Sequence, residues 1–324
     1  MKTLPTSESE KGVSFTAADF YEAGRERLQL QVAAGEAFLD RVIEEPVVNR
    51  PGLALTGFFE DFAWARVQLI GNAESAYLKS LDRRVREERF RALVERKAWL
   101  FVTTNGHKPD AVTRKMADEM GAVILTSPLQ TRVFARLATF ILEQLGAPRT
   151  SIYGTMVEVC GLGVMFEGDP GLGKSETALG LIKRGSALIA DDLTCIRKDV
   201  ACNLLFASAS EATRNYMEIR GIGIIHVPSV FGVTAVRAEK ELDLVVTLKS
   251  MKETEGELDR TGEERQTRTI LGVEVPQITI PVAAGRDLVN LVETAAQQYK
   301  LLAAGHDAVK ALDAQLCARA EGKL

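Results

Sequence analysis

The amino-acid sequence predicts an α/β protein of two domains, and three observations support that prediction. The chain has 324 residues, enough for about two domains that each bury a core. Its first half alternates short apolar runs with longer amphipathic segments, a pattern typical of a small α/β domain with a largely parallel sheet. Its second half places a glycine-rich phosphate-binding motif between a predicted strand and a predicted helix.

The first predicted domain comprises residues 14–146 and follows a polar N-terminus, residues 1–13, that we expect to be flexible. Apolar runs predict three strands, at residues 66–70, 99–103 and 122–125. Amphipathic patterns predict three helices, at residues 75–95, 110–120 and 129–145. This half contains no recognisable phosphate loop, metal cluster or nucleophile constellation. The one turn in this half that suggests a function contains His107, which we interpret as a solvated loop side chain.

The second predicted domain comprises residues 147–324 and begins where a helix stop is followed by Pro148. It is rich in strands, which we predict at residues 155–160, 163–166, 187–190, 242–248 and 275–280. Two helices are expected to close the chain, at residues 287–303 and 306–320. The nucleotide-binding residues are therefore expected to lie wholly in the second half.

Composition narrows the class of protein. Apolar residues make up 46% of the chain and charged residues 26%, as in a soluble globular protein. The net charge of −4 argues against a general nucleic-acid-binding protein, which needs a basic surface. The four cysteines show no disulfide or zinc spacing, and we found neither a signal peptide nor an apolar run long enough to span a membrane. We therefore expect a cytoplasmic protein without nucleic-acid or membrane partners.

Eight consecutive residues fit the phosphate-binding pattern G-x-x-x-x-G-K-[ST]. They are Gly168, Asp169, Pro170, Gly171, Leu172, Gly173, Lys174 and Ser175. The glycines allow backbone N–H groups to converge on phosphate oxygens, and the following helix adds its positive N-terminus. Lys174 would reach the β- and γ-phosphates, and the Ser175 hydroxyl would bind Mg²⁺. A glycine-rich turn without a ligand is the alternative, but the flanking strand and helix favour a nucleoside triphosphate site.

Asp191 and Asp192 are the first candidates for the remaining phosphoryl-transfer chemistry. They follow the apolar run of residues 188–190 and so lie at the carboxyl end of a predicted strand, where open α/β sheets bind ligands. One carboxylate can hold Mg²⁺ while its neighbour faces the acceptor hydroxyl. The alternative is a polar strand end with an aspartate that caps a helix.

Three further segments carry charged residues. Composition alone does not decide what these residues do. Glu218 and Arg220 stand beside a Gly-x-Gly, although such pairs often form exposed salt bridges of little energetic consequence. Asp259 and Arg260 belong to a highly charged segment, residues 252–268, that is typical of a mobile surface loop. Residues 281–287 end a strand, turn at a glycine and begin a helix.

Together these motifs resemble the HPr kinase/phosphorylase family. The resemblance rests on the order and spacing of residues 168–179, 184–185, 190–192, 218–225, 259–260 and 280–286. The first half is also similar, at residues 68–71 and in the helix that leads into residues 147–149, so the resemblance covers nearly the whole chain.

The resemblance implies a bacterial protein-serine kinase that acts on the phosphocarrier protein HPr with ATP and Mg²⁺. Many members also use pyrophosphate as donor and remove the phosphate by phosphorolysis. The implied fold is a phosphate-loop kinase domain similar to the phosphoenolpyruvate carboxykinase core, with an α/β N-terminal domain, and the implied assembly is a homohexamer.

Carried over by position, the resemblance also assigns residues. Residues 168–175 bind the triphosphate, Lys174 is catalytic, and Ser175 and Glu218 are Mg²⁺ ligands. The pair Asp191 and Asp192 accepts the proton of the substrate serine; we favour Asp192 as the base, but the sequence does not separate the two. Arg260 matches the catalytic arginine of the family. Residues 217–226 match the segment tied to phosphorylation, and residues 281–286 the segment tied to dephosphorylation.

The chain departs from the family at Tyr153. Members typically carry a His-Gly pair on the strand that approaches the phosphate loop, and here the pair is Tyr153 and Gly154. A tyrosine cannot become cationic, although its phenol still donates a hydrogen bond. We expect kinase activity to survive, while phosphorolysis and the use of pyrophosphate are the activities that this departure affects.

Two alternatives stay open at this point. A kinase of the same fold could act on another protein or on a small hydroxyl-bearing metabolite. A nucleotide-binding regulator with a degenerate site is the non-enzymatic alternative. Tyr153 favours it, and the intact lysine, serine, aspartates and arginine count against it.

Overall fold

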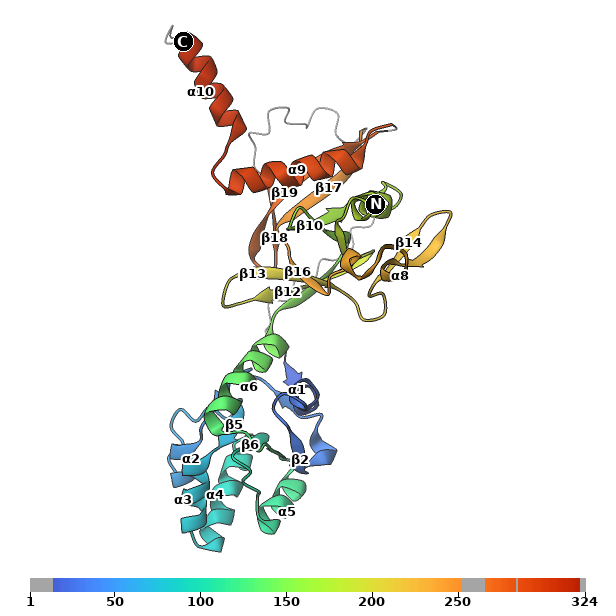
Figure 1. Ribbon diagram of the computed structural model, residues 1–324. Coiled ribbons are helices and arrows are strands. Elements are labelled where there is room, and N and C mark those ends of the chain that lie inside the picture. Colours follow the sequence, from blue (N-terminus) through green and yellow to red (C-terminus); the bar gives the residue numbers. More distant parts are fainter. Residues whose placement is uncertain (1–13, 252–265, 284, 321–324) are drawn as a thin grey trace, which may run out of the picture. The chain divides into compact units, whose positions relative to one another are not determined.

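The computed structural model describes residues 14–251, 266–283 and 285–320 and is shown in Figure 1. The chain divides into two compact units, with the division between Ala147 and Pro148. Arg260, Asp259 and the predicted flexible N-terminus lie outside the described residues.

The first unit is built on a sheet of five described strands in the order β2-β7-β6-β5-β4. The strands are β2 (Gln31–Ala34), β4 (Val48–Asn49), β5 (Val67–Ile70), β6 (Leu100–Thr103) and β7 (Val123–Thr126). The four neighbours from β4 to β7 run parallel, and β2 runs antiparallel at the edge. The short strands β1 (Phe15–Thr16) and β3 (Val42–Ile43) pair with each other. A largely parallel sheet is what the alternating sequence pattern predicted.

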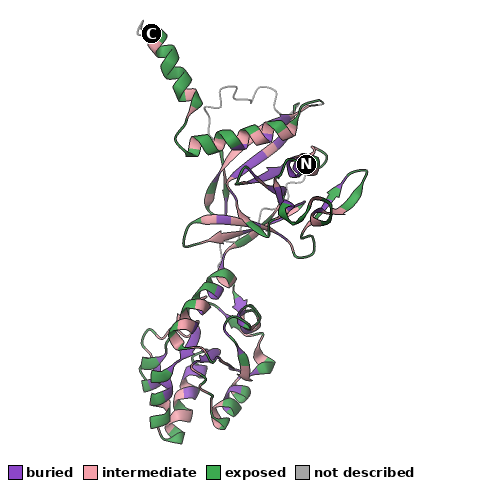
Figure 2. Cartoon of the chain, viewed as in Figure 1, coloured by how far each residue is buried: buried purple, intermediate pink, exposed green. Residues whose placement is uncertain are grey.

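Helices cover both faces of this sheet. One face packs against α1 (Ala17–Gly24) and α6 (Thr131–Gly146), in a core that includes Phe20, Leu69 and Phe134. The other face packs against α2 (Gly52–Thr56), α4 (Arg83–Glu95) and α5 (Ala111–Met120), in a core that includes Phe90 and Phe101. Figure 2 shows the buried residues of the unit gathered along its strands.

The single helix predicted over residues 75–95 is wrong, because the structure has two helices there. Helix α3 (Asn72–Ser80) begins earlier, and α4 begins only at Arg83. Leu81 and Asp82, between them, have extended backbone with ψ near 146° and 149°. Asp82 is a residue type favoured at helix N-caps, so a new helix start was legible in the sequence.

The described strands of the second unit form a larger sheet, a smaller sheet and a two-stranded hairpin. Six described strands form the larger sheet, in the order β11-β9-β10-β17-β19-β18. They are β9 (Thr155–Val159), β10 (Leu162–Glu167), β11 (Ala187–Ala190), β17 (Leu244–Ser250), β18 (Gln266–Ile270) and β19 (Val273–Val282). Strands β10, β17 and β19 run parallel, while β9 and β18 run antiparallel to their neighbours. Helices α7 (Lys174–Lys183) and α9 (Leu288–Ala303) pack on one face of this sheet.

The smaller sheet has the order β16-β13-β12-β8. Its strands are β8 (Arg149–Tyr153), β12 (Leu193–Asp199), β13 (Leu204–Ala209) and β16 (Glu239–Glu241). Buried side chains of both sheets, such as Met165 and Ala207, share one core. The sequence analysis did not predict β8, β12 or β13, because their alternating polar residues obscure the apolar runs that mark fully buried strands.

The remaining described elements are a hairpin, two α-helices and two short 3-10 helices, the last two at Glu36–Phe38 and Val233–Ala235. The hairpin consists of β14 (Tyr216–Ile219) and β15 (Gly223–His226), and the α-helices are α8 (Val227–Phe231) and α10 (Ala308–Ala320). Throughout the described residues, every helix is too short or too polar to cross a membrane.

Candidate active site

The phosphate loop and the aspartate pair lie at the same edge of the larger sheet. Strand β10 ends at Glu167 and leads directly into the loop, and β11 ends at Ala190 and leads into Asp191. Both strands pair antiparallel with β9, which lies between them, so β10 and β11 run in the same direction. Their carboxyl ends therefore meet at one edge, and that edge is where α/β sheets bind ligands.

All three glycines of the loop have a positive φ, and two of them show why glycine is needed there. Gly168 has a φ of 141°, and a Cβ there would lie 2.4 Å from the carbonyl oxygen of Leu248. Gly173 has a left-handed φ of 87° immediately before α7 begins at Lys174. No side chain of the described residues caps this helix, so its first N–H groups remain available for an anion. The loop thus has the conformation that a phosphate cradle needs.

Lys174 folds back across the loop. Its ammonium group donates hydrogen bonds to the carbonyl oxygens of Gly168, at 2.8 Å, and Asp169, at 3.2 Å. These contacts hold the positive charge against the backbone of the loop. The arrangement fits a triphosphate, because anionic oxygens bind an ammonium group more strongly than carbonyl oxygens do.

Asp191 is buried, with 5% of its surface exposed, and accepts three hydrogen bonds. One carboxylate oxygen accepts from the hydroxyls of Thr155, at 2.8 Å, and Ser175, at 3.1 Å. The other accepts from the backbone N–H of Glu218, at 3.1 Å. Burial raises the pKa of the Asp191 carboxyl above its usual value, and the three donors only partly oppose that shift. The structure thus joins Ser175, Asp191 and the Glu218 backbone.

Asp192 is exposed and differs from Asp191 in almost every respect. It adopts a left-handed backbone with a φ of 60°, and its carbonyl oxygen accepts a hydrogen bond from the Gly154 N–H at 2.9 Å. Within the described part of the chain, its carboxylate has no hydrogen-bond or ion-pair partner. A non-glycine residue in this region is uncommon and is typical of functional turns. Among the described residues, nothing holds this carboxylate away from a reactant.

Tyr153 lies beside this aspartate, but not on the strand where we placed it. The strand that enters the phosphate loop is β10, whereas Tyr153 ends β8 in the smaller sheet, opposite Leu193. All of β9 and a turn separate Tyr153 from the loop strand along the chain. Its side chain is 78% exposed. The pairing of β8 with β12 brings Tyr153 next to Asp192.

The hairpin β14–β15 carries Glu218 and Arg220 to the same edge. Glu218 contacts the site through its backbone, which donates to Asp191, while its side chain is exposed. A guanidinium nitrogen of Arg220 lies 3.9 Å from the position that a Cβ on Gly171 would occupy. The structure therefore brings the Arg220 guanidinium to the phosphate loop and the Glu218 backbone to Asp191.

Comparison with known proteins identifies the family. Residues 16–142 match the family model described as HPr Serine kinase N terminus, and residues 144–316 match the HPr Serine kinase C-terminal domain. The chain belongs to the HPr serine kinase family. The resemblance inferred from the sequence motifs is thereby confirmed.

Relatives of this family cover nearly the full chain. A protein named HPr kinase/phosphorylase from Leptospira biflexa is 41% identical over 284 residues, which are 87% of this chain and 88% of the relative. Another of that name, from Geobacter sulfurreducens, is 35% identical over 309 residues, or 95% and 96% of the two chains. A solved structure of the Hpr(Ser) kinase/phosphatase from Coxiella burnetii is 32% identical in sequence, with a TM-score of 0.46. The match covers 50% of this chain and 98% of the Coxiella burnetii chain.

One feature of this family member was missed in the sequence. Glu167, the last residue of β10, is buried beside the loop and forms an ion pair of 2.5 Å with Arg268 of β18. Its second carboxylate oxygen is buried and, among the described residues, has no hydrogen-bond partner. Burial raises the pKa of the Glu167 carboxyl, and the arginine only partly opposes it. A glutamate at the end of an apolar strand was the available signal.

The free energy of unfolding of Glu167→Gln, relative to that of the wild-type protein, is expected to increase as the pH rises. The raised pKa of Glu167 means that the folded state favours the protonated carboxyl. The stabilisation that the protonated carboxyl gives the folded state is fully present below pH 4.5, the ordinary pKa of a glutamate. It is lost as the pH rises through the raised pKa of Glu167. Urea unfolding below pH 4.5 and at neutral pH measures the difference. Glu211→Gln, an exposed glutamate of the same unit, is the control. A stability difference that does not change with pH would contradict the expectation.

Proposed function

We propose that this chain is a protein-serine kinase that transfers the γ-phosphoryl group of ATP to a serine of the phosphocarrier protein HPr. The observation that carries the proposal is the contact between Ser175 of the phosphate loop and the buried Asp191, with the exposed Asp192 beside it. A phosphate cradle, a metal-orienting carboxylate and an exposed carboxylate at one sheet edge are the parts that phosphoryl transfer needs. The names of the relatives support HPr as the acceptor.

Residues 168–175 would hold the triphosphate through backbone N–H groups, and Lys174 would neutralise its β- and γ-phosphates. Ser175 and Glu218 are the proposed Mg²⁺ ligands, with Asp191 orienting the Ser175 hydroxyl. Kinases hold Mg²⁺ by few protein ligands together with substrate phosphates, and no cluster of three or more potential ligands occurs among the described residues. Mg²⁺ would supply positive charge against the transferring phosphoryl group.

Asp192 is the proposed base. As the serine oxygen bonds to the γ-phosphorus, the bond from that phosphorus to the β,γ-bridging oxygen breaks, and ADP carries away the leaving electron pair. The serine hydroxyl proton passes to the Asp192 carboxylate, which is exposed and has no partner in the described part of the chain. Arg260, which lies outside the described residues, is proposed as the arginine that stabilises the transferring charge.

The test is phosphorylation of HPr by the purified full-length chain with ATP and Mg²⁺, followed by mass spectrometry of the modified residue. Phosphoserine on HPr is the expected product. Turnover with another acceptor but none with HPr would contradict the substrate, and no turnover with any acceptor would favour a nucleotide-binding regulator. The proposal includes a cytoplasmic homohexamer, and light scattering of the purified protein tests the assembly.

Tyr153→His is expected to increase phosphorolysis of phosphoseryl-HPr, and the use of pyrophosphate, more than it increases ATP-dependent phosphorylation. Tyr153 is exposed and adjacent to Asp192 through the β8–β12 pairing, so an imidazolium there would place positive charge beside the incoming phosphate. Initial rates of the forward and reverse reactions measure the effect. Tyr153→Phe is the matched control, because it removes the hydroxyl without adding charge. Equal changes in both directions for Tyr153→His would show that the position is not selective.

A further inference from the structure

The first unit contains a cavity of about 160 Å³ that no part of the proposed kinase mechanism uses. It lies beside Ile70 and Thr103, the last residues of the parallel strands β5 and β6. Such an edge is where open α/β sheets bind ligands. Side chains of α3, α4 and α5 complete the walls, and their chemistry indicates which kind of ligand fits.

The inner wall of the cavity is apolar and belongs to the core on this face of the sheet. Six buried side chains form it: Leu55, Ile70, Phe90, Leu93, Phe101 and Ile124. The rings of Phe90 and Phe101 lie close together, with 5.2 Å between their centroids. In other proteins, cavities of about 150 Å³ lined by Leu, Ile and Phe bind benzene. The volume and the inner wall therefore suit an apolar group the size of one ring.

Ser75 adds a buried polar group to this cavity. It lies in the middle of α3 and lines the cavity, and only 8% of its surface is exposed. Within the part of the chain that the structure describes, its hydroxyl has no hydrogen-bond partner. A buried hydroxyl without a partner costs free energy, and such groups are rare in folded proteins. A ligand oxygen in the cavity would supply the missing acceptor.

Arg86 contributes a second buried donor to the same cavity. Its Nη1 group donates to Asp110 at 3.0 Å, whereas its Nε–H is buried and has no acceptor among the described residues. Burial alone would raise the pKa of Asp110, but hydrogen bonds from Thr113 and the charge of Arg86 hold it below its usual value. The ionised Asp110 thus balances the charge of Arg86, while the Nε–H still lacks an acceptor.

The rim of the cavity carries positive charge. Lys79 and Lys108 line it and are exposed, and neither has an ion-pair partner in the described part of the chain. Of the described residues that line the cavity, Asp110 alone is acidic, and it is paired with Arg86. The remaining positive charge favours an anion over a neutral molecule.

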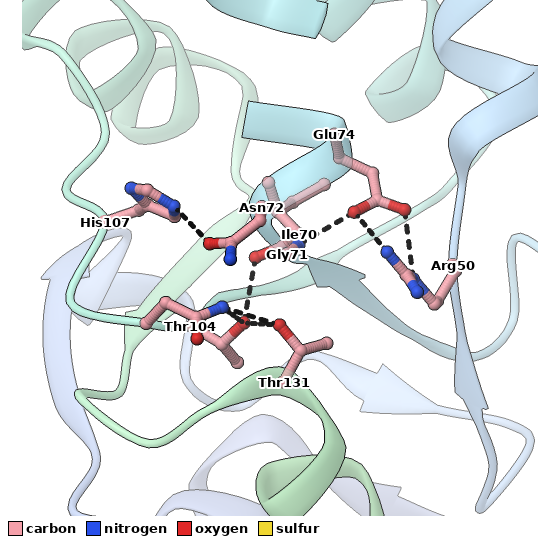
Figure 3. A network of polar contacts seen from close by, with 9 residues as sticks. Arg50, Ile70, Gly71, Asn72, Glu74, Thr104, His107 and Thr131 are labelled. Carbon is pink, nitrogen blue, oxygen red and sulfur yellow. Dashed lines mark hydrogen bonds and ion pairs between the residues drawn. The ribbon is translucent and has the colours of Figure 1, made fainter. Parts of the chain in front are cut away.

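Polar contacts hold the walls in place, as Figure 3 shows. The Glu74 carboxylate accepts from the Arg50 guanidinium, at 3.0 and 2.8 Å, and from the Gly71 N–H, which fixes the start of α3. His107, which lines the cavity, contacts the Asn72 side chain at 2.8 Å and so is only half-exposed. The cavity is thus formed before any ligand arrives, and this lowers the entropic cost of binding.

We propose that this cavity binds a small carboxylate whose apolar body is about the size of a benzene ring. The carboxylate oxygens accept hydrogen bonds from the Ser75 hydroxyl and the Arg86 Nε–H, and the apolar body packs against Phe90 and Phe101. Two oxygens match two buried donors, whereas a phosphate would bring a third oxygen and more charge into a largely apolar space. The inference does not depend on the kinase function, since all the residues involved lie in the first unit.

Hydrogen exchange of the full-length chain, followed by mass spectrometry, tests the proposal with benzoate as the probe. Slower exchange is expected in peptides that cover residues 70–80, 86–93 and 101–113, which contain most of the lining residues. Benzamide has the same ring without the charge, and acetate has the carboxylate without the ring. Neither is expected to slow exchange at the cavity as benzoate does. Unchanged exchange at the cavity with benzoate, or equal slowing with benzamide or acetate, would overturn the proposal.

A pair of serine variants on one helix makes the test specific. Ser75→Ala removes the hydroxyl in the cavity, and Ser80→Ala removes an exposed hydroxyl of α3 that does not line it. Ser75→Ala is expected to weaken benzoate binding roughly tenfold, as loss of a hydrogen bond to a charged group does, and Ser80→Ala is expected to change it little.

Thermal unfolding without benzoate distinguishes a ligand contact from a structural one. The Ser75 hydroxyl has no partner to lose among the described residues, so Ser75→Ala is expected to unfold at the wild-type temperature or above it. A lower unfolding temperature for Ser75→Ala, or equal affinities of the two variants for benzoate, would overturn the proposal.

Discussion

Lys174→Ala is expected to abolish phosphoryl transfer, with a loss of about 10³-fold or more in kcat, as when a preorganised charge is removed from a phosphoryl-transfer site. The ammonium group already lies at the loop, held by the carbonyl oxygens of Gly168 and Asp169. It therefore needs little rearrangement to contact the phosphates. Steady-state phosphorylation of HPr over a range of ATP concentrations separates a loss in kcat from a rise in KM.

Lys183→Ala is the matched control for this change. Lys183 lies in the last turn of the helix that Lys174 begins and is exposed, so its removal alters the same helix without touching the loop. It is expected to keep nearly full activity. If Lys174→Ala kept more than a small part of the wild-type kcat while the control was normal, the transferred phosphate would not lie at this loop.

The sequence predicted the parts of the site that lie next to one another in the chain. Residues 168–175 form a local motif, and Asp191 and Asp192 follow an apolar run that only a buried strand explains. Their meeting could be inferred too, because the carboxyl ends of strands that run in the same direction share one edge. The α/β class followed from the same alternation of strands and helices.

What the sequence did not predict depends on contacts between distant segments. The hydrogen bond from Thr155 to Asp191 and the ion pair between Glu167 and Arg268 join residues 36 and 101 positions apart. No local pattern marks such pairs. Strands β8 and β12 were missed because their residues alternate between polar and apolar, and Tyr153 was therefore placed on the wrong strand. Gly71, before α3, and Thr131, at the start of α6, likewise meet only in three dimensions.

The two aspartates are expected to differ when each is replaced by asparagine. Asp192→Asn should fold normally, since asparagine tolerates the left-handed backbone at this position and the carboxylate has no partner to lose within the described residues. It should lower kcat by about 10²–10⁴-fold, the usual contribution of a general base. The Mg²⁺ concentration needed for half-maximal activity should not change. Steady-state kinetics across Mg²⁺ concentrations, together with thermal unfolding, measure all three quantities.

Asp191→Asn should show the complementary behaviour. The Asp191 carboxylate accepts hydrogen bonds from Thr155, Ser175 and the Glu218 N–H. In asparagine, an NH₂ group replaces one carboxylate oxygen, so two donors would face each other at one or more of these contacts. We expect a loss of stability of about 1–3 kcal/mol and a higher Mg²⁺ requirement, because the Ser175 hydroxyl loses its orientation. Normal stability and Mg²⁺ dependence in Asp191→Asn, with full activity in Asp192→Asn, would reverse the two roles. The buried aspartate would then be the base, and its raised pKa would set the pH dependence of transfer.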